Sequence, residues 1–172
     1  AANLWLSERR VSPAALFVPP ETATEFVDVA VSDEGAKAVV IGDLGDSWDF
    51  AALNRAFRLL HADPEAVLVA LGMTRYWMSQ TGPSLDVAPF VVALEHASGR
   101  QAVVLGKPSR EFFEAAALKL GLPPSDLLMI GDDIRADVGG AQRGGLLGAI
   151  VKTGKFRPTD LEQDVQPDAV LN

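Results

Sequence analysis

The chain has 172 residues, with 23 acidic and 15 basic side chains, a formal net charge of −8 at pH 7 and no cysteine. The lack of cysteine excludes disulfide scaffolds, cysteine-ligated zinc, iron–sulfur clusters and thiol nucleophiles. The negative charge argues against a nucleic-acid partner, and the apolar runs are far shorter than the roughly 20 residues of a membrane span. No signal peptide is predicted, so the cytoplasm is the expected location.

Short apolar runs rich in Val, Ile and Leu predict β-strands. They cover residues 15–18, 38–41, 66–70, 102–105, 127–130 and 148–151. Continuous apolar runs of this length are typical of strands that are buried on both faces of a parallel sheet.

The segments between these strands predict helices with polar caps. Asp49 can cap a helix that runs to about residue 60, and Asp86 can cap a second helix that stops at Gly99. Ser109 can cap a third helix, which ends at Gly121. Strands that alternate with helices in this order predict an α/β protein with a mostly parallel sheet.

A stretch rich in Gly, Pro and Ser at residues 79–84 predicts a boundary between two parts of the chain. Residues 1–84 are expected to form a smaller α/β unit. Residues 85–172, with a more regular alternation of strands and helices, are expected to form part of a doubly wound core.

The strongest chemical signal is an acidic cluster after the strand predicted at residues 127–130. Asp132 and Asp133 follow this strand directly, and Asp137 lies one helical turn further on. Ligands bind at the carboxyl ends of parallel strands, and Mg²⁺ takes one or two carboxylates together with water and a phosphate. The alternative is that Asp133 or Asp137 caps the next helix, while Asp132 is a solvated loop end.

A lysine follows the strand predicted at residues 102–105, in the sequence Gly106-Lys107-Pro108. The compact charge of a lysine suits a phosphate or a carboxylate. Taken alone, Gly-Lys-Pro favours a surface lysine at a helix entry over a ligand-binding one. Together, Lys107 and the acidic cluster predict one site for a cation and a phosphate. Lys152 and Lys155 are expected to form a solvated basic turn, with guidance of an anionic substrate as the alternative.

These two segments resemble the third and fourth motifs of the haloacid dehalogenase-like phosphatases. The resemblance is carried by Gly106-Lys107-Pro108 and, about 25 residues later, by Gly131-Asp132-Asp133 with Asp137. The sequence looks most similar to the subfamily of NagD-like phosphatases, which carries a large α/β cap between its second and third motifs. The resemblance implies a haloacid dehalogenase-like Rossmannoid core, incomplete here, at residues 85–172. It also implies an α/β cap at residues 1–84, starting inside the first cap helix.

By the same resemblance, the chain is expected to be a Mg²⁺-dependent phosphatase that acts through an aspartyl-phosphate on a small phosphorylated substrate. Asp132 would bind Mg²⁺ directly, Asp137 would hold a metal-bound water or the ligand shell, and Asp133 is a further metal-ligand candidate. Lys107 would neutralise the phosphoryl group. Arg75 and Tyr76 would lie where the cap faces the site, and a homodimer through the cap is a further expectation.

The sequence departs from the family pattern because the Asp-x-Asp nucleophile segment and the Thr or Ser of the second motif do not occur in it. Asp43 and Asp46 are interpreted as cap residues. The chain is therefore expected to be a truncated or partial form, in which neighbouring core strands expose unpaired edges and apolar side chains. The alternative function is a non-catalytic module that binds a metal, a phosphate or a protein partner.

Overall fold

The computed structural model describes residues 1–172, and the chain forms two compact units. Unit 1 consists of Ala1–Arg75 and Leu85–Leu105, and unit 2 consists of Tyr76–Ser84 and Gly106–Asn172. The boundary expected after residue 84 coincides with one of the points at which the chain changes unit. The division into a cap and a core stays a prediction.

Unit 1 is built on a parallel sheet with the strand order β1-β2-β3-β6. Its strands are β1 (Ala14–Phe17), β2 (Ala38–Ile41), β3 (Val67–Ala70) and β6 (Val103–Val104). All four residues of β2 are buried, because helices cover both faces of the sheet. The strands predicted in this half of the chain are confirmed, with shifts of one residue at some ends.

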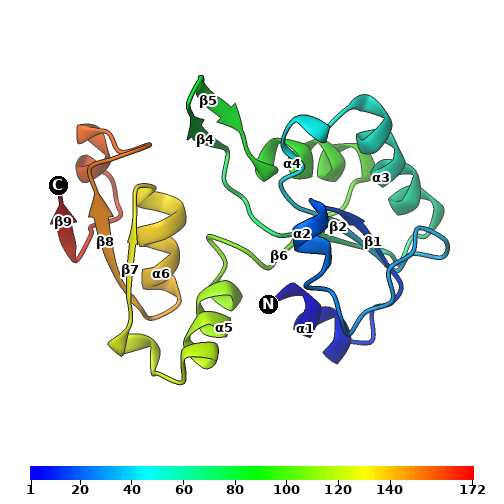
Figure 1. Ribbon diagram of the computed structural model, residues 1–172, viewed down its shortest axis with the longest axis horizontal. Coiled ribbons are helices and arrows are strands. Elements are labelled where there is room, and N and C mark those ends of the chain that lie inside the picture. The colour runs from blue at the N-terminus through cyan, green and yellow to red at the C-terminus, as the bar shows by residue number, and fades with distance from the viewer. The chain divides into compact units, whose positions relative to one another are not determined.

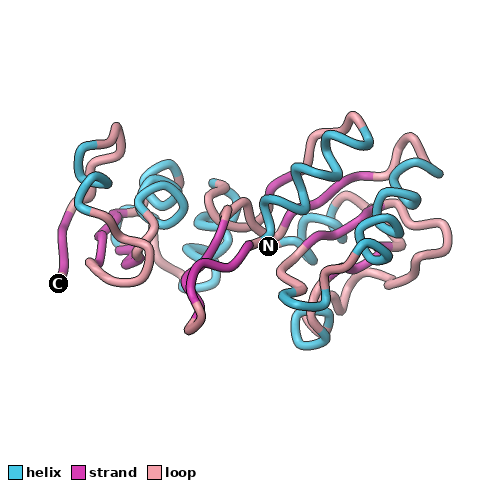
Figure 2. The backbone as a smooth tube through the Cα atoms, turned by 90° about the horizontal axis from the view of Figure 1, so that it is seen from above, coloured by secondary structure: helices cyan, strands magenta, loops and turns pink.

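Alternate residues of the strands point into two apolar clusters on opposite faces of this sheet. One cluster joins Phe17, Ile41 and their neighbours to α3 (Phe50–Ala62) and α4 (Val87–Ser98), which pack side by side in Figure 1. The other joins Val40 and its neighbours to α1 (Ala2–Glu8). Figure 2 shows the strands of this unit between helices. Burial of each large apolar side chain contributes about 1.5–3 kcal/mol.

Short segments complete unit 1, namely α2 (Pro20–Ala23) and the 3₁₀ turn η1 (Gly45–Ser47). The predicted caps are confirmed. Asp49 Oδ1 accepts a hydrogen bond from the amide of Ala52 at 2.7 Å, and Asp86 Oδ1 accepts one from the amide of Val87 at 2.7 Å. Gly99 ends α4 with a φ of 72°, in the left-handed region that favours glycine.

Unit 2 contains a second parallel sheet, of β7 (Leu128–Gly131), β8 (Leu147–Val151) and β9 (Ala169–Leu171), in that order. The helical segments are α5 (Arg110–Leu120), η2 (Pro124–Asp126), the π-helix η3 (Ile134–Gly139), α6 (Gly140–Arg143) and η4 (Pro158–Glu162). Ser109 caps α5 through a 3.3 Å bond from the amide of Phe112, and Gly121 ends it, as predicted.

The parallel strands thus form two separate sheets, one in each unit. β6 pairs with β3, whereas β7 begins the separate sheet of unit 2. β7 lies at the edge of its sheet, and its Leu128 and Ile130 are 49% and 53% exposed. An exposed strand edge with apolar side chains is what the sequence led us to expect.

A two-stranded sheet of β4 (Tyr76–Ser79) and β5 (Gly82–Leu85) overlaps residues 79–84, the stretch at which a boundary was predicted. The aromatic pair at residues 76–77 favours a strand. The Ser79 hydroxyl donates to the carbonyl of Gly82 at 2.8 Å, which closes the turn. None of the helices combines the length and the apolar character that a transmembrane span requires.

Candidate functional site

The site begins with an ion pair between Lys107, which follows β6, and Asp137, which lies in η3. The Lys107 ammonium donates to Asp137 Oδ1 at 2.8 Å, and the amide of Asp133 donates to Asp137 Oδ2 at 3.2 Å. The Asp137 side chain is 5% exposed, against 39% for Lys107. A buried carboxylate requires a charged partner, so Lys107 and Asp137 meet as the sequence predicted.

Gly131 makes room for the Asp137 carboxylate at the end of β7. A Cβ atom at residue 131 would collide with Cγ and Oδ2 of Asp137. The glycine therefore allows the buried carboxylate to lie directly against the strand backbone. This requirement gives a physical reason for the glycine that precedes the acidic cluster.

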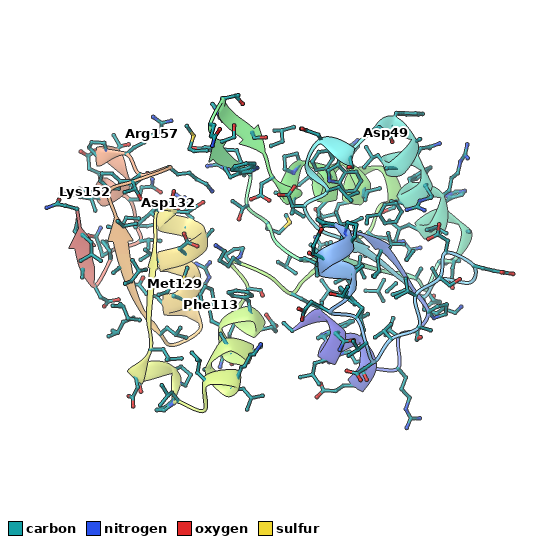
Figure 3. All side chains as sticks on the ribbon, viewed as in Figure 1. Asp49, Phe113, Met129, Asp132, Lys152 and Arg157 are labelled. Carbon is teal, nitrogen blue, oxygen red and sulfur yellow. The ribbon has the colours of Figure 1, made fainter.

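Asp132 lies immediately after β7, and Figure 3 shows it above Met129, which is a residue of that strand. Its Oδ2 accepts a hydrogen bond from the backbone amide of Lys155 at 2.7 Å. Gly154 has a φ of +50°, and a Cβ atom there would collide with Asp132 Oδ2. The other oxygen of Asp132 accepts no hydrogen bond from the protein, so it is free to bind a ligand.

Asp133 has a different environment from its neighbour, because it caps the π-helix η3. Its Oδ1 accepts hydrogen bonds from the amides of Arg135 at 3.0 Å and Ala136 at 2.9 Å. Its Oδ2 accepts one from the Lys155 ammonium at 2.7 Å. Burial raises the pKa of Asp133, but these hydrogen bonds and the Lys155 charge outweigh it and hold the pKa below its usual value. The capping alternative is thus confirmed for Asp133.

The three carboxylates do not form one cluster of metal ligands. No group of three or more His, Asp or Glu side chains is arranged to hold a metal ion. Each carboxylate has its own donors, and only Asp132 keeps a free oxygen. Since Mg²⁺ needs as few as one or two protein carboxylates, the donor set fits this ion through Asp132. Metal binding by Asp133 and Asp137 stays a prediction.

Tyr76 and Arg75 differ in their surroundings. The Lys155 ammonium lies 5.2 Å from the centre of the Tyr76 ring, within range of a cation–π contact. Arg75 is exposed, and its side chain makes neither a hydrogen bond nor an ion pair. A substrate-binding role for both residues stays a prediction.

Lys155 was expected in a solvated turn, but the structure places it in the site. Its side chain is 12% exposed, and it contacts both Asp133 and Tyr76. Lys152 is exposed and donates only to Asn172, at 3.1 Å. The prediction of a solvated basic turn is therefore confirmed for Lys152 and wrong for Lys155. The glycine at residue 154 is the one local signal that points to a close approach there.

Several known proteins are similar to this chain in sequence and in fold. Residues 104–172 match the HAD-hydrolase-like family. The chain is 43% identical over 160 residues to phospholysine phosphohistidine inorganic pyrophosphate phosphatase of Bos taurus, covering 93% of the chain and 58% of that protein. It is 41% identical over 171 residues to haloacid dehalogenase-like hydrolase domain-containing protein 2 of Homo sapiens, covering 99% and 64%. The chain thus spans less than two thirds of the length of these relatives.

Solved structures share the fold. The 4-nitrophenylphosphatase of Thermotoga maritima matches with a TM-score of 0.87 at 24% identity, covering 99% of this chain and 66% of that one. A glycerol phosphate phosphatase of Mycobacterium tuberculosis, in complex with calcium, matches with a TM-score of 0.85 at 22% identity, covering 98% and 52%. At these identities the likeness concerns the fold alone.

Proposed function

This chain belongs to the haloacid dehalogenase-like hydrolases, and from that premise we propose that its site serves the Mg²⁺-dependent hydrolysis of small phosphorylated molecules. The observation that carries the proposal is the arrangement of Lys107, Asp137 and Asp132. An ammonium fixed by a buried carboxylate lies in the same unit as a carboxylate that has a free oxygen. A lysine and a hard-cation ligand are the groups that a phosphate dianion requires.

Lys107 binds and orients the phosphoryl group in this proposal. Its contact with Asp137 restrains the ammonium, so little side-chain entropy remains to be lost when an anion binds. Because 39% of its side chain is exposed, the ammonium can meet a substrate while Asp137 stays buried. Asp132 would hold Mg²⁺, which when bound stabilises negative charge on phosphoryl oxygens. The calcium in the related glycerol phosphate phosphatase supports a divalent cation in this fold.

We propose that Tyr76 and Arg75 contribute to substrate choice. Tyr76 begins β4 and lies against Lys155, so its contact links the two-stranded sheet to the acidic loop. The relatives' names suggest phosphoric monoesters, P–N compounds and pyrophosphate as the substrate classes to test. The cytoplasmic location and the homodimer through the cap stay predictions from the sequence.

The 172 residues do not contain the family's nucleophile segment, because no Asp-x-Asp occurs in the sequence. The test therefore measures phosphate release with Mg²⁺ from 4-nitrophenyl phosphate, phospholysine and pyrophosphate. It compares the 172-residue chain with a version extended upstream in the coding sequence to include an Asp-x-Asp segment. Asp132→Asn and Lys107→Met are the test variants, and Asp126→Asn, at an exposed aspartate, is the control.

Activity in the extended version alone, lost in Asp132→Asn and Lys107→Met but retained in Asp126→Asn, is the expected result. Activity in the 172-residue chain itself would instead make Asp43 or Asp46 nucleophile candidates. A lack of phosphate release from both versions would reject the phosphatase proposal in favour of a non-catalytic binding module.

A further inference from the structure

Lys155 contacts two neighbouring carboxylates through two different groups. Its backbone amide donates to Asp132 Oδ2 at 2.7 Å, and its ammonium donates to Asp133 Oδ2 at 2.7 Å. One residue thereby holds both members of the Asp132–Asp133 pair. Lys155 lies beyond β8, so it fixes the loop after β7 from a neighbouring strand.

The surroundings of Lys155 keep its side chain in this position. Only 12% of the side chain is exposed, and the Tyr76 ring lies 5.2 Å from the ammonium. A lysine without partners would extend into water, because its ammonium is strongly hydrated. The burial of Lys155 therefore reflects its partners, Asp133 and the ring of Tyr76.

Gly154 sets the distance between the turn and Asp132. Its φ of +50° and its missing Cβ allow the Asp132 carboxylate to lie against the turn backbone. The amide of Lys155 then donates to one carboxylate oxygen of Asp132, and the other accepts no hydrogen bond from the protein. The result is a carboxylate with one oxygen bound and one oxygen free.

We propose that Lys155 is a positioning residue for the metal ligand Asp132. Its amide donates to Asp132, and the contacts of its ammonium with Asp133 and Tyr76 hold the turn at the position from which that amide reaches Asp132. The ammonium also commits Asp133 to the cap of η3. Asp133 is then a second positioning residue instead of a ligand. This inference rests on the proposed function, because it deepens the account of the same site.

Simple electrostatics predicts the opposite effect for a lysine that has no positioning role. Removal of a positive charge near a cation site strengthens cation binding, because the repulsion between the two charges disappears. Removal of a positioning residue weakens binding, because the ligand loses its orientation. The sign of the change in affinity therefore separates the two roles.

The first experiment measures Mn²⁺ binding to the 172-residue chain by electron paramagnetic resonance, with Mn²⁺ as the probe for Mg²⁺. Lys155→Met removes the ammonium and keeps most of the side-chain length, and Lys155→Arg keeps the charge. Lys152→Met removes an equal charge at an exposed residue outside the site. We expect Lys155→Met to bind Mn²⁺ about 10- to 100-fold more weakly, Lys155→Arg to recover much of the affinity, and Lys152→Met to match the parent chain.

Unchanged or tighter Mn²⁺ binding in Lys155→Met would overturn the proposal. A second measurement needs no metal. It follows amide hydrogen exchange at Arg135 and Ala136, whose amides donate hydrogen bonds to Asp133. Faster exchange at these two amides in Lys155→Met supports the anchoring of Asp133, and unchanged exchange rejects it.

The two measurements also separate this inference from the proposed function. Mn²⁺ binding with the expected losses, but no phosphate release from any version of the chain, would reject the phosphatase and leave the positioning role in place. A parent chain that bound no Mn²⁺ would reject the metal site in both proposals, and the exchange rates would still decide whether Lys155 anchors Asp133.

Discussion

Lys107→Met tests the ion pair on which the site depends. The substitution leaves the Asp137 carboxylate, whose side chain is 5% exposed, with a single remaining donor, the amide of Asp133 at 3.2 Å. Loss of one partner from a buried ion pair costs about 3–5 kcal/mol. Because the Lys107 side chain is 39% exposed, water screens the pair on that side. We therefore expect a loss at the lower end of this range, about 3 kcal/mol at pH 7.

The free energy of unfolding should be read from unit 2 itself, because the chain forms two compact units. Hydrogen exchange at the amides of β8 reports the opening of that unit. Lys152→Met is the matched control, since it removes the same charge from an exposed residue that bonds only to Asn172. We expect this control to stay within about 0.5 kcal/mol of the parent chain.

A double variant decides whether the cost comes from an unpaired charge. In Lys107→Met with Asp137→Asn, no buried charge remains, so the double variant should be more stable than Lys107→Met by about 1 kcal/mol or more. A loss below about 1 kcal/mol in Lys107→Met, or a double variant whose loss equals the sum of the single losses, would refute the reasoning.

Three further predictions concern other parts of the chain. Gly154→Ala should weaken Mn²⁺ binding and lower the stability of the chain, because the new Cβ displaces the Asp132 carboxylate. Gly35→Ala is the control: Gly35 has a φ of 67° and open space around it, so this substitution should cost only about 1–2 kcal/mol of stability in a urea melt. Leu60→Ala, in the fully buried core of unit 1, should cost about 2–5 kcal/mol, whereas Leu118→Ala, at a residue that is 76% exposed, should change the melt little. The pKa of Asp168 is lowered mainly by the hydrogen bond from a β8 amide, so its stabilising effect is present above about pH 3.9 and is lost as pH falls through the lower folded pKa. The urea midpoint of Asp168→Asn should accordingly fall less on acidification than that of the parent chain; equal falls would contradict the assignment.

The regular elements follow from local sequence because each signal has a local physical cause. β2 was predicted with its observed ends, since four consecutive apolar residues suit a strand that is covered on both faces. The starts of α3, α4 and α5 were found because a side-chain oxygen at the cap satisfies a free helix amide. These interactions involve residues at most three positions apart.

The rest of the fold depends on contacts that the local sequence does not encode. The pairing of β6 with β3, and of β7 with β8, is decided by tertiary packing, so the apolar runs alone do not show which strands are neighbours. The segment of β4 and β5 contains Gly, Pro and Ser, which favour turns and loops and led to the prediction of a boundary at residues 79–84. Its strands become evident only when their pairing is known.

The acidic cluster shows how a local motif and distant residues divide the determination of a site. The motif supplies three carboxylates within six residues, at 132, 133 and 137, and like charges so close together repel one another. The structure resolves this repulsion by giving each carboxylate a different donor set, and the decisive donors, Lys107 and Lys155, lie more than 20 residues away in sequence. The motif therefore fixes which side chains are present, and the two lysines fix what each can do. It follows that a lysine substitution outside the motif should change what the carboxylates can do: Lys107→Met affects Asp137, and Lys155→Met affects Asp133 and, through it, Asp132.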